Sequence, residues 1–246
     1  RKLSSEMNIA LPTEEPFGEA WTLHDTCHIA NGALAGNTIA DIVASHGAEL
    51  IGNENDPADG FPLLAKIIDA SAWLSIQVHP DDAQAKALEN QPRGKTEAWV
   101  VLAADDGAQL VIGVTPGTSR QAMADAIQNN TLEEYIVYAD VQAGDVLYIP
   151  ANTIHALGPG IVIYEIQQSS NTTYRLYDWG RMGLDGKPRE LHIEKGVQVS
   201  NVDFLPDVTH PADQLMVDGQ YFPTIRHTLD NATETISTHA KFQSLS

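Results

Sequence analysis

Four side chains that can bind a transition metal stand in this sequence where predicted β-strands would hold them. Gln77 and His79 are two residues apart, so on a strand both side chains point to the same face. Glu97 opens the apolar run EAWVVL, and His155 follows a loop that contains Pro150. Imidazole nitrogens, a carboxylate and an amide oxygen suit zinc, iron or manganese better than calcium or magnesium. With three strong protein ligands and a position left for water, a zinc site of this kind would be catalytic.

Taken singly, these residues have simpler interpretations. A lone histidine on a strand is more often a satisfied core or surface residue than a metal ligand. The tryptophans Trp73, Trp99 and Trp179 are better interpreted as core or rim aromatics than as a sugar platform. The remaining histidines have no ligand spacing and stay unassigned: His24, His28, His46, His192, His210, His227 and His239.

Short strands separated by glycine and proline must position the four residues. Residues 61–78 are apolar and β-branched enough for two buried strands joined near Asp69. Residues 97–102 and 108–114 are expected to pair around the turn at residues 105–107. This pattern predicts a mainly β fold, a barrel or sandwich of the jelly-roll type with a few short helices. Further strands are expected to begin near Tyr135, Asp145, Ile161 and Tyr174.

Capping residues predict the helices. Asp81 or Asp82 is expected to cap a helix that ends near residue 88, and Thr118 or Ser119 one that ends near residue 128. Thr131 and Glu134 have the spacing of a capping box, which predicts another short helix.

The sequence changes character after Val197. Residues 204–211 resemble a linker with two prolines, and residues 221–229 and 234–246 resemble two strands of another sheet. Two strands alone are marginally stable. We therefore expect a metal-binding catalytic domain over residues 1–200, followed over residues 201–246 by a linker and the first strands of an incomplete second domain.

Composition limits the function. The 246 residues are 43% apolar and carry a formal charge of −19, which argues against nucleic acid and membranes as partners. The single cysteine, Cys27, excludes an intramolecular disulfide and fits a reducing compartment, so we expect a cytoplasmic protein. The sequence has no apolar run of about 18 residues, so no membrane-spanning helix is expected, and no signal peptide is expected either. A phosphate ligand would need local cations to overcome the negative field, and the oligomeric state stays open.

Several motifs, in order and spacing, resemble the type I mannose-6-phosphate isomerases in their short bacterial form. Gly144, Pro150, Asn152 and His155 match the second motif of the cupin superfamily, with Asn152 at a position where the motif has glycine. Asparagine suits that position if it requires a positive φ. QVHPDD, GKTE, IPANTIHALG and YEIQQSSNTTYRLYDWGR extend the match from about residue 18 to residue 195. The resemblance implies a cupin (jelly-roll) barrel and the start of a second, incomplete cupin.

The resemblance also implies roles for individual residues. The family's metal ligands fall on Gln77, His79, Glu97 and His155, which implies one Zn²⁺ per chain. The family's catalytic arginine falls on Arg175, and Lys95 matches a lysine that lines the pocket. Four further residues align with pocket positions, of which we assign one to catalysis, Glu165, and three to substrate binding, Lys66, Ser75 and Trp21. Asn171 stands where the family has aspartate, so one local carboxylate is lost.

The implied activity is a zinc-dependent aldose–ketose isomerisation that interconverts mannose 6-phosphate and fructose 6-phosphate through an enediol(ate). The base would be His79, Glu165 or a metal-bound water, and Arg175 would stabilise negative charge because its guanidinium stays protonated. Simpler interpretations make Arg175 a rim salt bridge with Asp178 and Lys95 a solvated loop cation. Two other functions stay open: an Fe(II) cupin oxygenase, which holds iron with two histidines and a carboxylate, and a non-catalytic sugar-binding or regulatory cupin.

Overall fold

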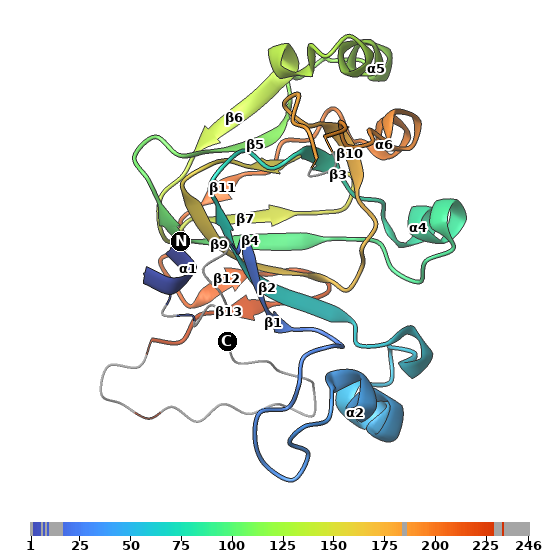
Figure 1. The fold of residues 1–246 in the computed structure, drawn as a ribbon, viewed down its shortest axis with the longest axis vertical. Helices are drawn as coiled ribbons and strands as arrows, with labels where there is room; N and C mark the ends of the chain where they lie inside the picture. The colour runs from blue at the N-terminus through green and yellow to red at the C-terminus, as the bar shows by residue number, and fades with distance from the viewer. Residues whose placement is uncertain are drawn as a thin grey trace.

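The computed structural model describes residues 2–5, 7, 9, 17–183, 186–228 and 233. They form a mainly β fold with a few short helices, as the sequence predicts (Figure 1). The helices are α1 (Lys2–Ser5), α2 (Ile39–His46), α3 (Ala48–Ile51), α4 (Asp82–Glu89), α5 (Arg120–Gln128) and α6 (Ile193–Val199). The strands are β1 (Glu19–Leu23), β2 (Leu63–Ala70), β3 (Ile76–Val78), β4 (Glu97–Ala104), β5 (Gln109–Val114), β6 (Ile136–Asp140), β7 (Val146–Ile149), β8 (Ala156–Leu157), β9 (Ile161–Gln168), β10 (Tyr174–Tyr177), β11 (Val208–Thr209), β12 (Leu215–Val217) and β13 (Thr224–Ile225).

Two β layers face each other across an interior that carries the site. One layer is a six-stranded antiparallel sheet in the order β1-β2-β9-β4-β7-β11. The other combines the sheet β6-β5-β8 with the pair β10-β3. A bridge between Gln77 and His155 connects the two parts of this second layer.

The interior is apolar at one end. Trp99 and Val101 of β4, Ile163 of β9 and Leu147 of β7 are buried there against Leu110, which comes from β5 in the opposite layer. Burying side chains from both layers supplies the main driving force for holding the two sheets together.

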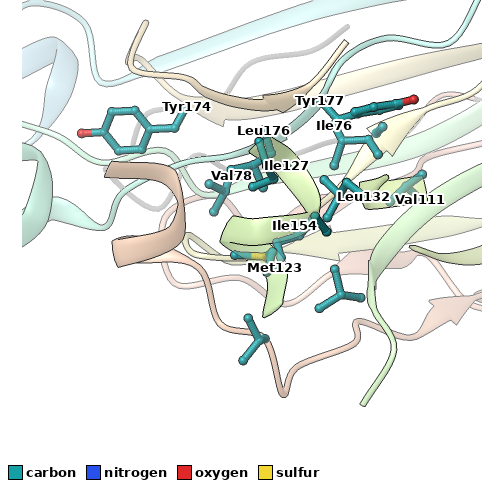
Figure 2. Close-up of a cluster of buried hydrophobic side chains, with 14 of the residues drawn as sticks. Ile76, Val78, Val111, Met123, Ile127, Leu132, Ile154, Tyr174, Leu176 and Tyr177 are labelled. Atoms are coloured by element: carbon teal, nitrogen blue, oxygen red, sulfur yellow. The ribbon is translucent and has the colours of Figure 1, made fainter. Parts of the chain in front are cut away.

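Helices α5 and α6 cover the outer face of the second layer, at the top of Figure 1. Ser119 caps α5 by accepting a hydrogen bond from the backbone of Ala122 at 3.1 Å, as predicted. Figure 2 shows the cluster beneath, in which Met123 and Ile127 of α5 lie with Ile76 and Val78 of β3. This packing supports the outer face of the strand whose inner face carries Gln77.

The outer face of the six-stranded sheet is covered by α2, α3 and the hairpin β12–β13, in the lower half of Figure 1. Phe61 and Ala98 are completely buried there, together with Met216 and Phe222 from the C-terminal part. Residues 208–209 also join the sheet as β11. The described part of residues 201–228 therefore packs on the preceding fold, and a domain boundary at residue 200 stays a prediction.

Three local predictions are corrected. β4 and β5 do not pair with each other: β4 pairs with β7 and β9, and β5 with β6 and β8, so the turn at residues 105–107 passes from one layer to the other. The predicted capping box at Thr131 is wrong, because residues 132–135 form a single 3₁₀ turn without a side-chain cap. The strands β2 and β3 are separated by residues 71–75 rather than joined near Asp69.

Helix α4 begins as predicted. Asp81 and Gln84 form a reciprocal capping box at its N-terminus. The second predicted C-terminal strand, residues 234–246, lies outside the described residues. No helix within the described ranges is long and apolar enough to cross a lipid bilayer.

Candidate metal centre and surrounding site

Three segments place their side chains in one row at the polar end of the interior. Gln77 in β3 exchanges two backbone hydrogen bonds with His155, each 3.0 Å long. On its other side, Gln77 is the cross-strand partner of Arg175 in β10. Directly opposed residues of an antiparallel pair project to the same face. The structure therefore brings together three predicted site residues that lie almost a hundred positions apart in the chain.

Two histidines and a carboxylate converge beside this row. His155 Nε2 lies 3.1 Å from Glu97 Oε1, and His79 Nε2 lies 3.6 Å from Glu97 Oε2. Their ligand atoms all lie within 4.8 Å of one another, and all three residues are buried. Ligands bound to zinc at about 2.1 Å in a tetrahedron are about 3.4 Å apart, so the spacing fits a single ion. Gln77 Nε2 is 3.3 Å from His155 Nε2, and a half turn of that amide would present its oxygen instead.

Backbone carbonyls fix the tautomer of both histidines. His79 Nδ1 donates to Thr172 O at 3.0 Å, and His155 Nδ1 donates to Thr153 O at 2.9 Å. A carbonyl only accepts, so Nδ1 carries the proton and the Nε2 lone pair faces the carboxylate of Glu97. Burial, followed by the nearby Lys95 cation, holds the pKa of His79 well below its usual range. Neutral imidazoles held in this way are suited to bind a metal.

Glu97 provides a buried negative charge. Burial acts to raise the pKa of this carboxyl, but the Lys95 ammonium and the His155 imidazole together lower it well below its usual value. Neither Glu97 oxygen has a hydrogen bond of normal geometry within the described residues. Lys95 Nζ, however, lies 2.6 Å from Oε2 and 3.1 Å from His79 Nε2. Lys95 is buried, so it is not the solvated loop cation of the simpler interpretation.

The loop that presents Lys95 and Glu97 is held by successive backbone N–H groups. Gly94 N donates to Asp82 Oδ1 at 2.7 Å, and Lys95 N donates to Pro80 O at 3.0 Å. Thr96 N donates to the side chain of Gln168 at 2.9 Å. The backbone at Gly94 packs closely against the backbone at Asp81, because a Cβ at Gly94 would lie 2.4 Å from the carbonyl carbon of Asp81.

Sequence reasoning missed two residues of this support. Asp82 also accepts from Gln168 Nε2 at 3.0 Å and from Tyr221 Oη at 2.9 Å. The sequence assigned Asp82 only to helix capping. Gln168 is the second of the two glutamines in YEIQQSS, and this local pattern gives no signal for a contact 72 positions away.

Asn152 has the positive φ expected of the glycine that it replaces in the motif, 73°. Its backbone N donates to His79 O at 2.8 Å, and its Nδ2 donates to Gln84 Oε1 at 2.6 Å. The side chain therefore connects the loop before His155 to the segment that carries His79.

A second row of predicted residues crosses the six-stranded sheet. In register, Trp21 of β1 lies opposite Lys66 of β2, and Lys66 lies opposite Glu165 of β9. Lys66 Nζ is 3.2 Å from both Glu165 Oε1 and Glu19 Oε2. Burial, and then the neighbouring Glu97 charge, raise the pKa of Glu165. Trp21 is 42% exposed at the rim.

The remaining predicted residues lie at the edge of the site. Ser75 is buried two positions before Gln77, and Asn171 is exposed. Arg175 Nη1 donates to Glu190 O at 2.9 Å, while its buried Nε has no hydrogen-bond partner in the described part of the chain. The predicted alternative, a rim salt bridge between Arg175 and Asp178, is not found among the described residues, where the Asp178 carboxylate pairs with Arg181 and Arg189.

Comparison with known proteins identifies the family. Residues 1–116 match the family model "Phosphomannose isomerase type I, catalytic domain". The chain is 31% identical to the mannose-6-phosphate isomerase of Bacillus subtilis, whose crystal structure superposes with a TM-score of 0.78 over 90% of this chain and 73% of that one. This chain belongs to the type I phosphomannose isomerase family. Its mainly β fold is therefore the cupin fold of that family.

Two curated members of the family extend the comparison. The chain is 39% identical to the mannose-6-phosphate isomerase of Streptococcus mutans over 205 residues, which are 82% of this chain. It is 36% identical to the probable mannose-6-phosphate isomerase GmuF of B. subtilis over 214 residues, which are 85% of this chain. The matched part spans 63% and 66% of those two proteins, respectively.

Proposed function

We propose that this protein is a metal-dependent mannose-6-phosphate isomerase that interconverts mannose 6-phosphate and fructose 6-phosphate. One observation carries the proposal: His79, Glu97 and His155 converge in a buried cluster, in a chain that belongs to the type I family. One proton moves from C2 of the open-chain aldose to C1, and a second moves from the C2 hydroxyl to O1, so that C2 becomes the ketone and the C1 aldehyde becomes a hydroxymethyl group. Fructose 6-phosphate and mannose 6-phosphate are isomers, so this transfer balances without a co-substrate.

We assign one Zn²⁺ per chain to Gln77, His79, Glu97 and His155. The mixed nitrogen and oxygen donors support a divalent transition metal, and the paired Nδ1–H groups support imidazole ligation through Nε2. When bound, such an ion supplies Lewis-acid polarisation of the sugar oxygens.

Glu165 is the group that we assign to the proton transfer. It is buried, and its pKa is raised, which brings a carboxyl closer to the proton affinity that transfer near neutral pH requires. His79 is less suited, because its Nδ1 is engaged by Thr172 O and its Nε2 faces Glu97 and Lys95.

We assign the cations to the negative charges of the substrate. Arg175 lies beside Gln77, and its guanidinium stabilises charge on the enediolate without acting as a base. We assign Lys95, which pairs with Glu97, to the stabilisation of negative charge in the same part of the substrate. Lys66, with Ser75 and Trp21, would bind the substrate, and a phosphate would compete for Lys66 with the half-exposed carboxylate of Glu19. These local cations oppose the field of a chain with a formal charge of −19.

Two further proposals concern the setting. A single cysteine supports a reducing, cytoplasmic location. The change in composition after residue 197 supports a domain boundary near residue 201, where a second cupin would begin.

A coupled assay for fructose 6-phosphate formation tests the function. Arg175→Ala should lose at least about 100-fold in kcat/KM, the effect of removing a charge-stabilising group. Arg226→Ala, at an exposed arginine, is the matched control and should match wild type. Equal rates in all three proteins would refute the role of Arg175. Thermal stabilisation by the hexose phosphate without turnover would indicate a sugar-binding cupin, and oxygen uptake with bound iron an oxygenase.

A further inference from the structure

Trp99 lies between the two functional groups of the site. It is 2% exposed, in the strand β4 two residues after Glu97. Its indole Nε1 donates to Glu165 Oε2 at 2.9 Å. The hydrogen bond follows from the register, because β4 pairs with β9 so that Trp99 and Glu165 are directly opposed.

The carboxylate of Glu165 is held from both flanking strands. Lys66 of β2 lies 3.2 Å from Oε1, and Trp99 of β4 binds Oε2. The two partners differ in kind: one is a cation with a second carboxylate partner, Glu19, and the other is a neutral donor on a buried ring. A rigid, neutral donor fixes the orientation of a carboxylate without neutralising it.

The other side of the indole contacts the metal centre. The rings of Trp99 and His155 meet edge to face, with centroids 5.4 Å apart and an interplanar angle of 81°. This geometry is a favourable aromatic arrangement. The indole therefore touches a predicted metal ligand and the predicted proton-transfer group at once.

We propose that Trp99 is a positioning residue that orients the Glu165 carboxylate for proton transfer. The expected loss of activity rests on the proposed isomerase function. The expected orientation of the Glu165 carboxylate rests on the hydrogen bond alone. Loss of the indole N–H leaves Glu165 Oε2 without its only hydrogen bond in the described part of the chain and frees the carboxylate to turn.

Kinetics of Trp99→Phe test the proposal, because phenylalanine keeps an aromatic ring against His155 and removes the donor. We expect kcat to fall by about 10- to 100-fold, as for a misplaced catalytic group, with KM within about twofold of wild type. In a Glu165→Gln background the same substitution should cause less than about a twofold further loss, because the group that it positions is already disabled. Trp73→Phe, at a tryptophan that stacks on Trp179 outside the site, is the matched control and should keep wild-type kcat.

Metal content and NMR supply readouts that do not depend on turnover. Zinc in Trp99→Phe should equal that of wild type. The chain has four tryptophans, so the indole region of a ¹H–¹⁵N spectrum holds four signals, and the signal lost in Trp99→Phe identifies that of Trp99. In Glu165→Gln this signal should move upfield by several tenths of a ppm in ¹H, while that of Trp179, which donates to Leu74 O, stays in place.

The outcomes separate the two proposals. An unshifted Trp99 signal in Glu165→Gln would overturn the positioning role, as would wild-type kcat in Trp99→Phe or an equal loss in both backgrounds. An inactive wild-type protein in which the signal shifts would overturn the isomerase function and leave the contact between Trp99 and Glu165 established.

Discussion

Removing the charge of Glu97 should destabilise the metal-free protein strongly. In Glu97→Gln the side-chain shape is kept, but Lys95 Nζ, which lies 2.6 Å from the lost carboxylate on a side chain that is 92% buried, loses its ion-pair partner in the described part of the chain. Breaking a buried pair in this way costs about 3–5 kcal/mol. The Coulomb energy at this distance with an effective dielectric constant of 20, about 6 kcal/mol, is large enough to account for such a loss.

The double variant Lys95→Met/Glu97→Gln should recover most of that loss. It removes both charges, and replacing a buried ion pair with neutral side chains is often close to neutral in stability. The double-mutant cycle should therefore give a coupling energy of about 2 kcal/mol or more between Lys95 and Glu97. Lys195→Met, which breaks a pair whose lysine side chain is 44% exposed, is the control and should change stability by less than about 1 kcal/mol.

Urea unfolding in the presence of a chelator measures five proteins: wild type, Lys95→Met, Glu97→Gln, the double variant and the control Lys195→Met. Far-ultraviolet circular dichroism and tryptophan fluorescence at pH 7 supply two independent probes of the same transition. A coupling energy below about 1 kcal/mol, or a double variant less stable than Glu97→Gln, would refute the assignment of a buried Lys95–Glu97 pair.

Three further predictions follow from single contacts. Gly94→Ala should lower the unfolding free energy by about 1–3 kcal/mol in urea, because its Cβ would lie 2.4 Å from the Asp81 carbonyl carbon; an unchanged midpoint would contradict that contact. Asn152→Ala should be about 1 kcal/mol less stable than Asn152→Gly, because φ at this position is 73°; equal urea midpoints would argue against it. Burial and the hydrogen bond to Asp82 raise the pKa of Tyr221 from 10.0 to about 12, so this phenol stabilises the fold below pH 10 and that contribution is lost as the pH rises through 12. Phenolate absorbance should be titrated with pH in wild type and in Tyr221→Phe, and the difference between the two curves should have its midpoint near pH 12. A midpoint near pH 10 would show that the hydrogen bond is absent.

Local features of this fold could be predicted from the sequence. The alternation of side chains along SIQVHP placed Gln77 and His79 on one face, and the serine at position 119 gave the start of α5. The positive φ of Asn152 followed from the glycine of the motif. Each of these features depends on residues within a few positions of one another, where sterics and capping decide.

Pairing between distant segments could not be predicted in the same way. A turn at residues 105–107 suggests a hairpin, but β4 pairs with β9, 57 to 70 positions later, and with β7 on its other edge. As a central strand, β4 needs hydrogen-bond partners for the backbone groups on both edges, and the sequence does not say which strands supply them. The contact of Trp99 with Glu165 depends on this register, so it was invisible in the sequence. The resemblance to a family, rather than periodicity, associated Arg175 with Gln77.

Metal analysis of the purified protein tests the central claim most directly. After reconstitution with zinc and removal of excess ion, mass spectrometry should find one zinc per chain in wild type and almost none in His155→Ala, because one of the two imidazoles that face Glu97 is lost. His210→Ala, at a half-exposed histidine that contacts Asp145 outside the cluster, should retain the metal. Stoichiometric zinc in His155→Ala, or none in wild type, would contradict the assignment of this cluster as the metal centre.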